Sequence, residues 1–197
     1  MKPRVPCGVG MGTRSLVLLG SGWHPPLFRE ECKALLGPIE TLHPRLTFVT
    51  QLDSILDRIS GASLVDEVLH STSRLWVYKR EVSSEDIATY VDEWAESFLP
   101  IGSFAVRARK LGKGVCDLSR RDLESKIGAK ISSDQRPVDL EDPDSEIVVI
   151  LAGPGDSSEH WDDVQQNPLI LWGVRDTSFS GTYTGTSPTE RPFFKPV

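Results

Sequence analysis

The sequence has few cysteines, and their spacing does not suggest that they pair. Cys7, Cys32 and Cys116 are odd in number, lie far apart and form no C-x-x-C pair. This pattern argues against a disulfide framework and gives no support to a zinc site. It fits a reducing compartment, so we expect a cytoplasmic protein without metal ligands.

Long apolar runs are also missing. The longest contain five or six residues, far short of the roughly 20 that a membrane-spanning helix needs. The first dozen residues carry Lys2, Arg4 and three glycines but no apolar core of a signal peptide. We therefore interpret residues 1–13 as a flexible leader.

What the chain does have is a local excess of positive charge. Its 197 residues are 39% hydrophobic and 25% charged, which is typical of a soluble globular protein, and the net charge is −6. The stretch from Ser103 to Arg136 holds nine Lys or Arg against four Asp or Glu, a net of +5 that leaves −11 for the remainder. Such asymmetry inside an acidic protein indicates a polyanionic partner.

The first third of the chain predicts a small α+β domain. Apolar runs predict strands at 15–19, 39–42, 46–49 and 64–69. Pro25-Pro26 opens a helix that Gly37-Pro38 ends, and Asp53 is a plausible N-cap for a helix that Gly61 closes. The order β-α-β-β-α-β is the ferredoxin-like pattern. We assign it to residues 14–72.

Residues 73–183 predict a second domain, of α/β type. Thr72 to Arg80 is interpreted as the connection, and Ser83-x-x-Asp86 has the spacing of a capping box at the start of a helix ended by Pro100 and Gly102. A strand follows at 104–109, and Ser119-x-x-Asp122 starts a second helix. Residues 138–144 predict a turn, and further strands are expected at 146–151, 169–174 and 179–183.

The basic residues of this second domain come from three consecutive elements. In the strand, Phe104, Val106 and Ala108 alternate with the positions that carry Arg107 and Arg109, so both arginines share one face, expected to be the outer one. A glycine-containing loop and the start of the next helix supply more cations. The predicted RNA-binding residues are Arg107, Arg109, Lys110, Lys113, Arg120, Arg121, Lys126, Lys130 and Arg136.

From Phe104 to Leu151 the sequence resembles a THUMP domain. The matching residues are Phe104, Val106, Arg107, Asp122, Leu123, Lys126, Ile127, Gly128, Ile131, Val138, Asp139, Leu140, Pro143 and Asp144. THUMP domains are RNA-binding modules of tRNA-modifying enzymes and typically follow a ferredoxin-like domain. The resemblance implies that this chain holds the acceptor stem and the 3′ CCA end of tRNA.

The last residues resemble a connection to a catalytic domain. Arg191-Pro-Phe-Phe-Lys-Pro is similar to the segment that precedes the methyltransferase domain of archaeal tRNA guanosine-10 N2-methyltransferases. The resemblance implies that S-adenosylmethionine is bound by that domain. Its N/D-P-P-Y/F motif is missing here, so we expect no catalytic residue in this chain and interpret residues 184–197 as a linker.

Several alternatives stay open at this stage. Arg107 and Lys126 could instead form ion pairs with Glu124 or Asp122 within the domain. The chain could be a stand-alone THUMP adaptor that presents tRNA to a separate modifying enzyme through Phe193 and Phe194. It could also be a small transferase in its own right, which detectable S-adenosylmethionine binding would indicate.

Overall fold

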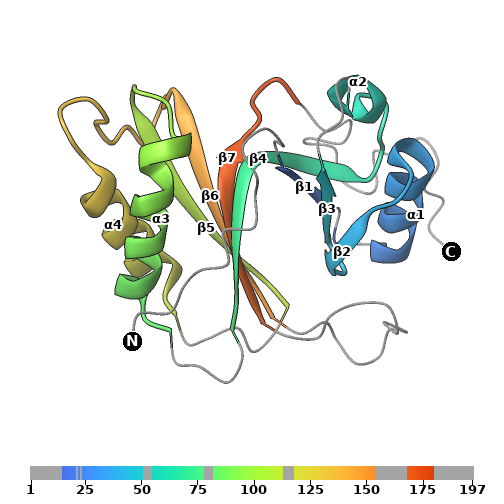
Figure 1. The fold of residues 1–197 in the computed structure, drawn as a ribbon, viewed down its shortest axis with the longest axis horizontal. Coiled ribbons are helices and arrows are strands. Elements are labelled where there is room, and N and C mark those ends of the chain that lie inside the picture. Colours follow the sequence, from blue (N-terminus) through green and yellow to red (C-terminus); the bar gives the residue numbers. More distant parts are fainter. Residues whose placement is uncertain are drawn as a thin grey trace, which may run out of the picture.

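The computed structural model describes residues 15–20, 22, 24–50, 55–77, 82–112, 118–153 and 168–179. Helices and strands are interspersed along this part of the chain, with the helices on two opposite sides of the molecule (Figure 1). In chain order the elements are β1 (Ser15–Gly20), α1 (Pro25–Leu36), β2 (Glu40–His43), β3 (Leu46–Thr50), α2 (Ile55–Ile59), β4 (Val65–Trp76), α3 (Ser84–Phe98), β5 (Phe104–Leu111), α4 (Arg120–Ile131), β6 (Ser145–Ala152) and β7 (Leu169–Arg175).

The strands of this described part form one mixed sheet of seven, in the order β2-β3-β1-β4-β7-β6-β5. Only β5 and β6 are paired in parallel, with α4 as the crossover between them. The other neighbours are antiparallel. The fold is therefore α+β, and the predicted β-α-β-β-α-β order of its first part is observed.

β4 joins the two parts of the sheet because it pairs with a different neighbour at each end. Its first residues pair with β1 and its later ones with β7. Between the pairings with β7 at His70 and Ser73 the register shifts, and Ser71 has a φ of 53°. A bulge of this kind bends a strand and increases its local twist.

The length of β4 corrects one prediction. Thr72 to Arg80 was expected to be a connection, but the strand continues to Trp76. The predicted domain boundary between residues 72 and 73 therefore falls inside a strand. Pairing with β7, almost 100 residues further along the chain, extends β4, and no local pattern encodes a partner that distant.

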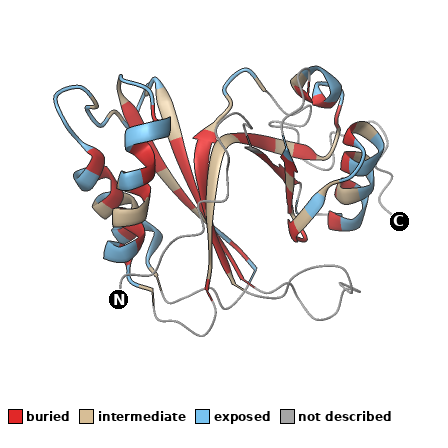
Figure 2. Cartoon of the chain, in the orientation of Figure 1, coloured by how far each residue is buried: buried red, intermediate tan, exposed pale blue. Residues whose placement is uncertain are grey.

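The buried apolar residues on the two faces of the sheet form three separate cores, because β4 bends (Figure 2). Phe104, Val106 and Ala108 pack under α3 and α4, whereas Leu16 and Leu18 pack under α1 and α2. The opposite faces of both parts meet in a third core, where Val17 of β1 clusters with Val148 of β6. The N-terminal part thus covers the sheet face that α3 and α4 leave free.

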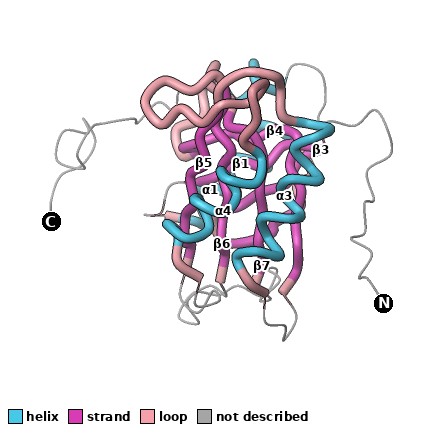
Figure 3. The backbone as a smooth tube through the Cα atoms, turned by 90° about the vertical axis from the view of Figure 1, so that its left-hand side faces the viewer, coloured by secondary structure: helices cyan, strands magenta, loops and turns pink. Residues whose placement is uncertain are grey.

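Helices α3 and α4 lie side by side over one end of the sheet (Figure 3). Ser83 and Asp86 form the predicted capping box of α3, and the Ser119 hydroxyl accepts the backbone N–H of Asp122 at the start of α4. Trp94 stacks on Phe98 and is buried, with its indole N–H donated to the Ser71 carbonyl at 2.7 Å. No helix among the described residues is long and apolar enough to cross a bilayer.

Candidate nucleic-acid interface

The two arginines of β5 lie on the sheet face opposite α3 and α4, as the alternation predicts. Phe104, Val106 and Ala108 belong to the helix-covered core, and the intervening positions face the other way. That face is not an open surface, because Ala105 is completely buried and Leu111 belongs to the core shared with the N-terminal part. Arg107 and Arg109 are about two-fifths exposed, with side-chain exposures of 40% and 38%.

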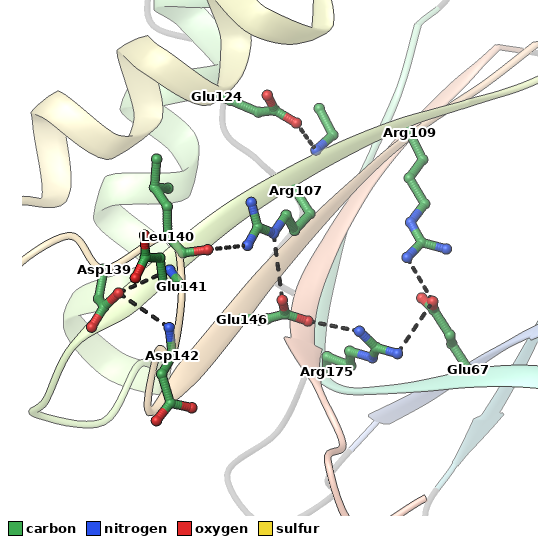
Figure 4. Close-up of polar contacts among 11 residues, drawn as sticks. Glu67, Arg107, Arg109, Glu124, Asp139, Leu140, Glu141, Asp142, Glu146 and Arg175 are labelled. Carbon is green, nitrogen blue, oxygen red and sulfur yellow. Dashed lines mark hydrogen bonds and ion pairs between the residues drawn. The ribbon is translucent and has the colours of Figure 1, made fainter. Parts of the chain in front are cut away.

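Both arginines are part of an ion-pair chain across four strands (Figure 4). Arg109 Nη2 lies 2.6 Å from Glu67 Oε1 on β4, and Arg175 Nη2 of β7 lies 3.7 Å from the same oxygen. Arg175 Nη1 donates to Glu146 Oε2 of β6 at 2.8 Å, and Arg107 Nε contacts Glu146 Oε1 at 3.4 Å. We call these five residues the arginine–glutamate network.

Electrostatics within the network favour the charged forms of Glu146 and Arg175. Burial alone would raise the pKa of Glu146, but the hydrogen bonds and charges of Arg175 and Arg107 outweigh it and lower that pKa. The hydrogen bond to Glu146 in turn raises the pKa of Arg175. Glu67 has a side chain only 8% exposed, and a carboxylate so deeply buried requires cationic partners. The network therefore ties β5, β6 and β7 to β4.

Three other predicted cations, Lys110, Arg120 and Arg121, belong to the opposite side of the sheet, which α3 and α4 cover. Lys110 follows Ala108 on the helix-covered face of β5, and Arg120 and Arg121 form the first turn of α4. The Glu124 carboxylate accepts the Ala108 N–H at 2.7 Å and so fixes the start of α4 against the end of β5. We call these three residues the exposed basic cluster, because all three side chains are exposed.

The exposed basic cluster differs from the network in its partners. Within the described residues, no ion pair or side-chain hydrogen bond engages Lys110, Arg120 or Arg121. Lys113, predicted to belong to the same surface, lies outside the described residues. A cluster without carboxylate partners at a helix N-terminus is suited to bind phosphate, since the first backbone N–H groups of the helix also favour an anion.

The remaining three predicted residues have partners of their own. Lys126 pairs with Asp122 at 3.3 Å, one of the alternatives left open by the sequence, and Lys130 pairs with Glu85 of α3 at 3.3 Å. Hydrogen bonding from Ser84, followed by the pairing with Lys126, lowers the pKa of Asp122. Both ion pairs are solvent-exposed, and exposed pairs of this kind are weak, so neither excludes a second role for the lysine.

Arg136 is placed differently again, at the far end of α3. Its Nη2 donates to the carbonyl of Leu99, the C-cap residue of α3, at 3.1 Å. The sequence also left open an ion pair between Arg107 and Glu124. This pair is not formed, because Arg107 Nη2 donates to the Leu140 carbonyl at 2.8 Å and its Nε faces Glu146. The nine predicted residues thus do not all share one surface.

The sequence interpretation missed Glu67 and Glu146, the acidic partners of Arg107 and Arg109, and also Arg175, which pairs with both glutamates. A signal was present for two of them. Glu146 stands at the beginning and Arg175 at the end of apolar runs that form buried strands. In the antiparallel pairing of β6 and β7 these strand ends meet at one edge of the sheet.

Comparison with known proteins identifies a shared fold. No family model and no curated protein matches the chain. Among solved structures, TrmN from Thermus thermophilus matches with a TM-score of 0.53 and 20% identity over 83% of this chain and 46% of TrmN. A protein named as a predicted N6-adenine-specific DNA methylase from Listeria monocytogenes matches with a TM-score of 0.52 and 13% identity over 91% of this chain and 46% of its own.

A 4-thiouridine synthetase solved in complex with RNA and ATP matches more distantly, with a TM-score of 0.46 and 16% identity over 82% of this chain and 41% of the synthetase. The chain thus spans less than half the length of each of these three proteins. At such identities the likeness is one of fold. The described residues have the α+β fold found in TrmN and in the Listeria protein.

Proposed function

We propose that this chain is a THUMP-type RNA-binding module that holds the acceptor stem and 3′ CCA end of tRNA. The observation that carries the proposal is the exposed basic cluster, in which three cations without described partners come from the end of β5 and the first turn of α4. The phosphate backbone supplies most of the affinity of such interfaces, and arginine and lysine at a helix start recognise phosphate directly.

Two further observations support the proposal. The stretch that resembles a THUMP domain corresponds to β5, α4 and β6, and its apolar matches Phe104, Leu123 and Ile127 are fully buried. The polar match Asp144 accepts the backbone N–H and the hydroxyl of Ser103, which lowers its pKa. The shared fold with TrmN agrees with a role in tRNA modification.

The proposal extends to the organisation of the whole protein. The N-terminal strands stand in the order β2-β3-β1-β4 with antiparallel pairing, which supports a ferredoxin-like domain ahead of the THUMP domain. We further propose that the module serves an archaeal-type guanosine-10 N2-methyltransferase. S-adenosylmethionine would then be bound by a catalytic domain and not by this module, which positions the RNA.

Binding of intact and trimmed tRNA tests the function. The affinity for a tRNA transcript is measured across a salt series. The measurement is then repeated after removal of the single-stranded CCA end. We expect log affinity to fall by roughly 0.7 to 0.9 per contacted phosphate for each log unit of salt, and trimming to weaken binding. Equal affinity for intact and trimmed tRNA would contradict the acceptor-end assignment.

A further inference from the structure

Arg74 of β4 lies against two aromatic rings, outside both the exposed basic cluster and the arginine–glutamate network. Its guanidinium carbon is 5.0 Å from the centre of the Phe48 ring on β3 and 6.0 Å from the Trp76 ring on β4. Both distances are within the range of a cation–π contact. We call Phe48, Arg74 and Trp76 the arginine–aromatic group.

The carboxylate of Glu40 on β2 holds the Arg74 guanidinium in place. Arg74 Nη1 donates to Glu40 Oε1 at 3.0 Å, and Nη2 donates to Glu40 Oε2 at 3.3 Å. Hydrogen bonds of this kind engage the edge of the guanidinium and leave its flat faces to planar partners. Because its contacts come from β2, β3 and β4, the group is oriented before any ligand binds, which lowers the cost of binding.

The arginine–aromatic group is only partly covered by the rest of the protein. Phe48 and Trp76 pack against the third core but are half-buried, and the Arg74 side chain is 32% exposed. Arg74 and Trp76 pair with β7 on one side. The pairing of β4 with β1 ends at His70, so no described strand lies on their other side. A flat surface therefore remains accessible near the end of β4.

A flat cation supported by aromatic rings is suited to stack a nucleic-acid base. Single-stranded RNA is recognised by stacking of its unpaired bases on aromatic side chains and on the planes of arginine guanidinium groups. The contact tolerates any sequence, because every base has an aromatic face. The ion pair with Glu40 offsets the charge of Arg74, so this group favours a base over a phosphate.

The arginine–aromatic group lies at the same end of the sheet as the exposed basic cluster. Lys110 pairs with Leu151, Leu151 with Ile170, and Ile170 with Leu75, which directly precedes Trp76. Three strand spacings, about 14 Å, separate β5 from β4 along this row. Successive nucleotides of a stacked strand are roughly 3.4 Å apart, so a few nucleotides cover a comparable distance. The two surfaces face opposite sides of the sheet, and an RNA strand that contacts both runs around this end of it.

We propose that the arginine–aromatic group stacks an unpaired base of single-stranded RNA. The inference rests on the proposed function for the identity of that RNA, which is then the 3′ end of tRNA. It adds a second kind of recognition to that function. The exposed basic cluster contacts phosphates, whereas the arginine–aromatic group contacts the face of a base.

Two short RNAs test the stacking without tRNA. One is a single-stranded hexanucleotide that ends in CCA, and the other has abasic sites in place of its last three bases, so both carry the same phosphates. We expect the wild type to bind the first about tenfold more tightly, as for one stacked base, in a fluorescence anisotropy titration. Arg74→Lys keeps the charge but lacks the flat guanidinium, so it should lose this preference. Trp76→Leu should reduce it.

The abasic hexanucleotide also reports on folding, because both variants should bind it as the wild type does. Arg58→Lys is the matched control, since it changes an exposed arginine of α2 and should keep the full preference. Equal binding of the two RNAs by the wild type, or an undiminished preference in Arg74→Lys, would overturn the proposal. A tenfold preference in the wild type that Arg74→Lys abolishes, together with equal affinity for intact and trimmed tRNA, would support the stacking and contradict the acceptor-end assignment.

Discussion

Among single residues, His43 shows how much of the environment of a side chain comes from distant parts of the chain. It lies at the end of β2 and is 5% exposed, and its Nδ1 accepts the backbone N–H of Arg45 at 3.2 Å. Burial, followed by the charge of Arg45, lowers its pKa to about 4, although a backbone hydrogen bond to Gly153 acts in the opposite direction. His43 is therefore neutral at physiological pH.

This pKa predicts a loss of stability in mild acid. Because the pKa is about 4 in the folded protein and near 6.5 in the unfolded chain, the unfolded chain takes up the proton first as the pH falls. Stability is retained above about pH 6.5 and lost progressively towards pH 4. Between pH 7 and pH 4.5 the wild type should lose about 2 kcal/mol more than His43→Asn, which keeps an acceptor for Arg45.

Urea unfolding at several pH values measures this difference. Because the other titrating groups are common to both proteins, comparison of wild type and variant isolates the contribution of His43. Parallel pH profiles for the two proteins would show that His43 is as easily protonated in the folded state as in the unfolded chain.

Gly173 supports a second prediction, because it faces the bulge of β4. A Cβ at this position would lie 2.7 Å from Thr72 Cγ2 and 3.0 Å from the His70 carbonyl oxygen. The backbone oxygen cannot move aside without disturbing the bend, so Gly173→Ala should destabilise the protein by about 1–3 kcal/mol. Gly61→Ala is the control, since a Cβ there meets nothing within 4 Å. Thermal unfolding of both variants checks the difference, and equal melting temperatures would contradict it.

At the scale of elements, the arginine–glutamate network is what makes Arg107 and Arg109 differ from the other cations of the predicted site. Arg109 on β5 reaches Glu67 on β4, although two strands lie between them in the sheet. Such a contact is possible because β4 bends and brings its first half over the face of β5, β6 and β7. The network and the core shared by Val17 and Val148 therefore hold the same two parts together.

Removal of Arg109 should destabilise the protein. Arg109→Ala leaves the nearly buried carboxylate of Glu67 with Arg175 at 3.7 Å, so we expect a loss of about 1–3 kcal/mol, below the range for a fully buried pair because Arg109 is 38% exposed. The double variant Arg109→Ala/Glu67→Gln should recover part of the loss, since no unpaired charge remains. Arg121→Ala, an exposed cation, should stay within about 0.5 kcal/mol of the wild type.

Chemical denaturation of these four proteins gives the comparison. An Arg109→Ala variant as stable as Arg121→Ala would mean that the pair with Glu67 adds nothing to the fold.

Local elements were predictable from the sequence because their signals are local. Ser83 and Ser119 mark the starts of α3 and α4, and Pro25 with Gly37 marks the limits of α1. The alternation in β5 correctly placed Arg107 and Arg109 on one face. What covers that face could not be predicted, because it depends on the bend in β4 and on pairing between residues 69–76 and 169–175. Contacts between distant segments have no periodicity to reveal them.

At the scale of the whole molecule, the structure separates two surfaces of opposite chemistry. The exposed basic cluster lies where β5 ends and α4 begins, and the acidic segment of residues 132–145 lies where α4 has ended and β6 begins. The positive charges counted between Ser103 and Arg136 therefore do not form one surface. Lys110, Arg120 and Arg121 are available to an anion, whereas Arg107 and Arg109 of β5 form ion pairs with glutamates. We propose that the first group binds RNA.

The most direct test of this assignment compares tRNA binding by two double variants of equal charge change. Arg120→Ala/Arg121→Ala removes two cations of the exposed basic cluster, and Lys33→Ala/Arg58→Ala removes two exposed cations from α1 and α2. The account predicts that the first weakens binding at least tenfold and reduces the slope of log affinity against log salt by roughly 1.5, while the second stays close to the wild type. Equal weakening by both variants, or none by the first, would contradict it.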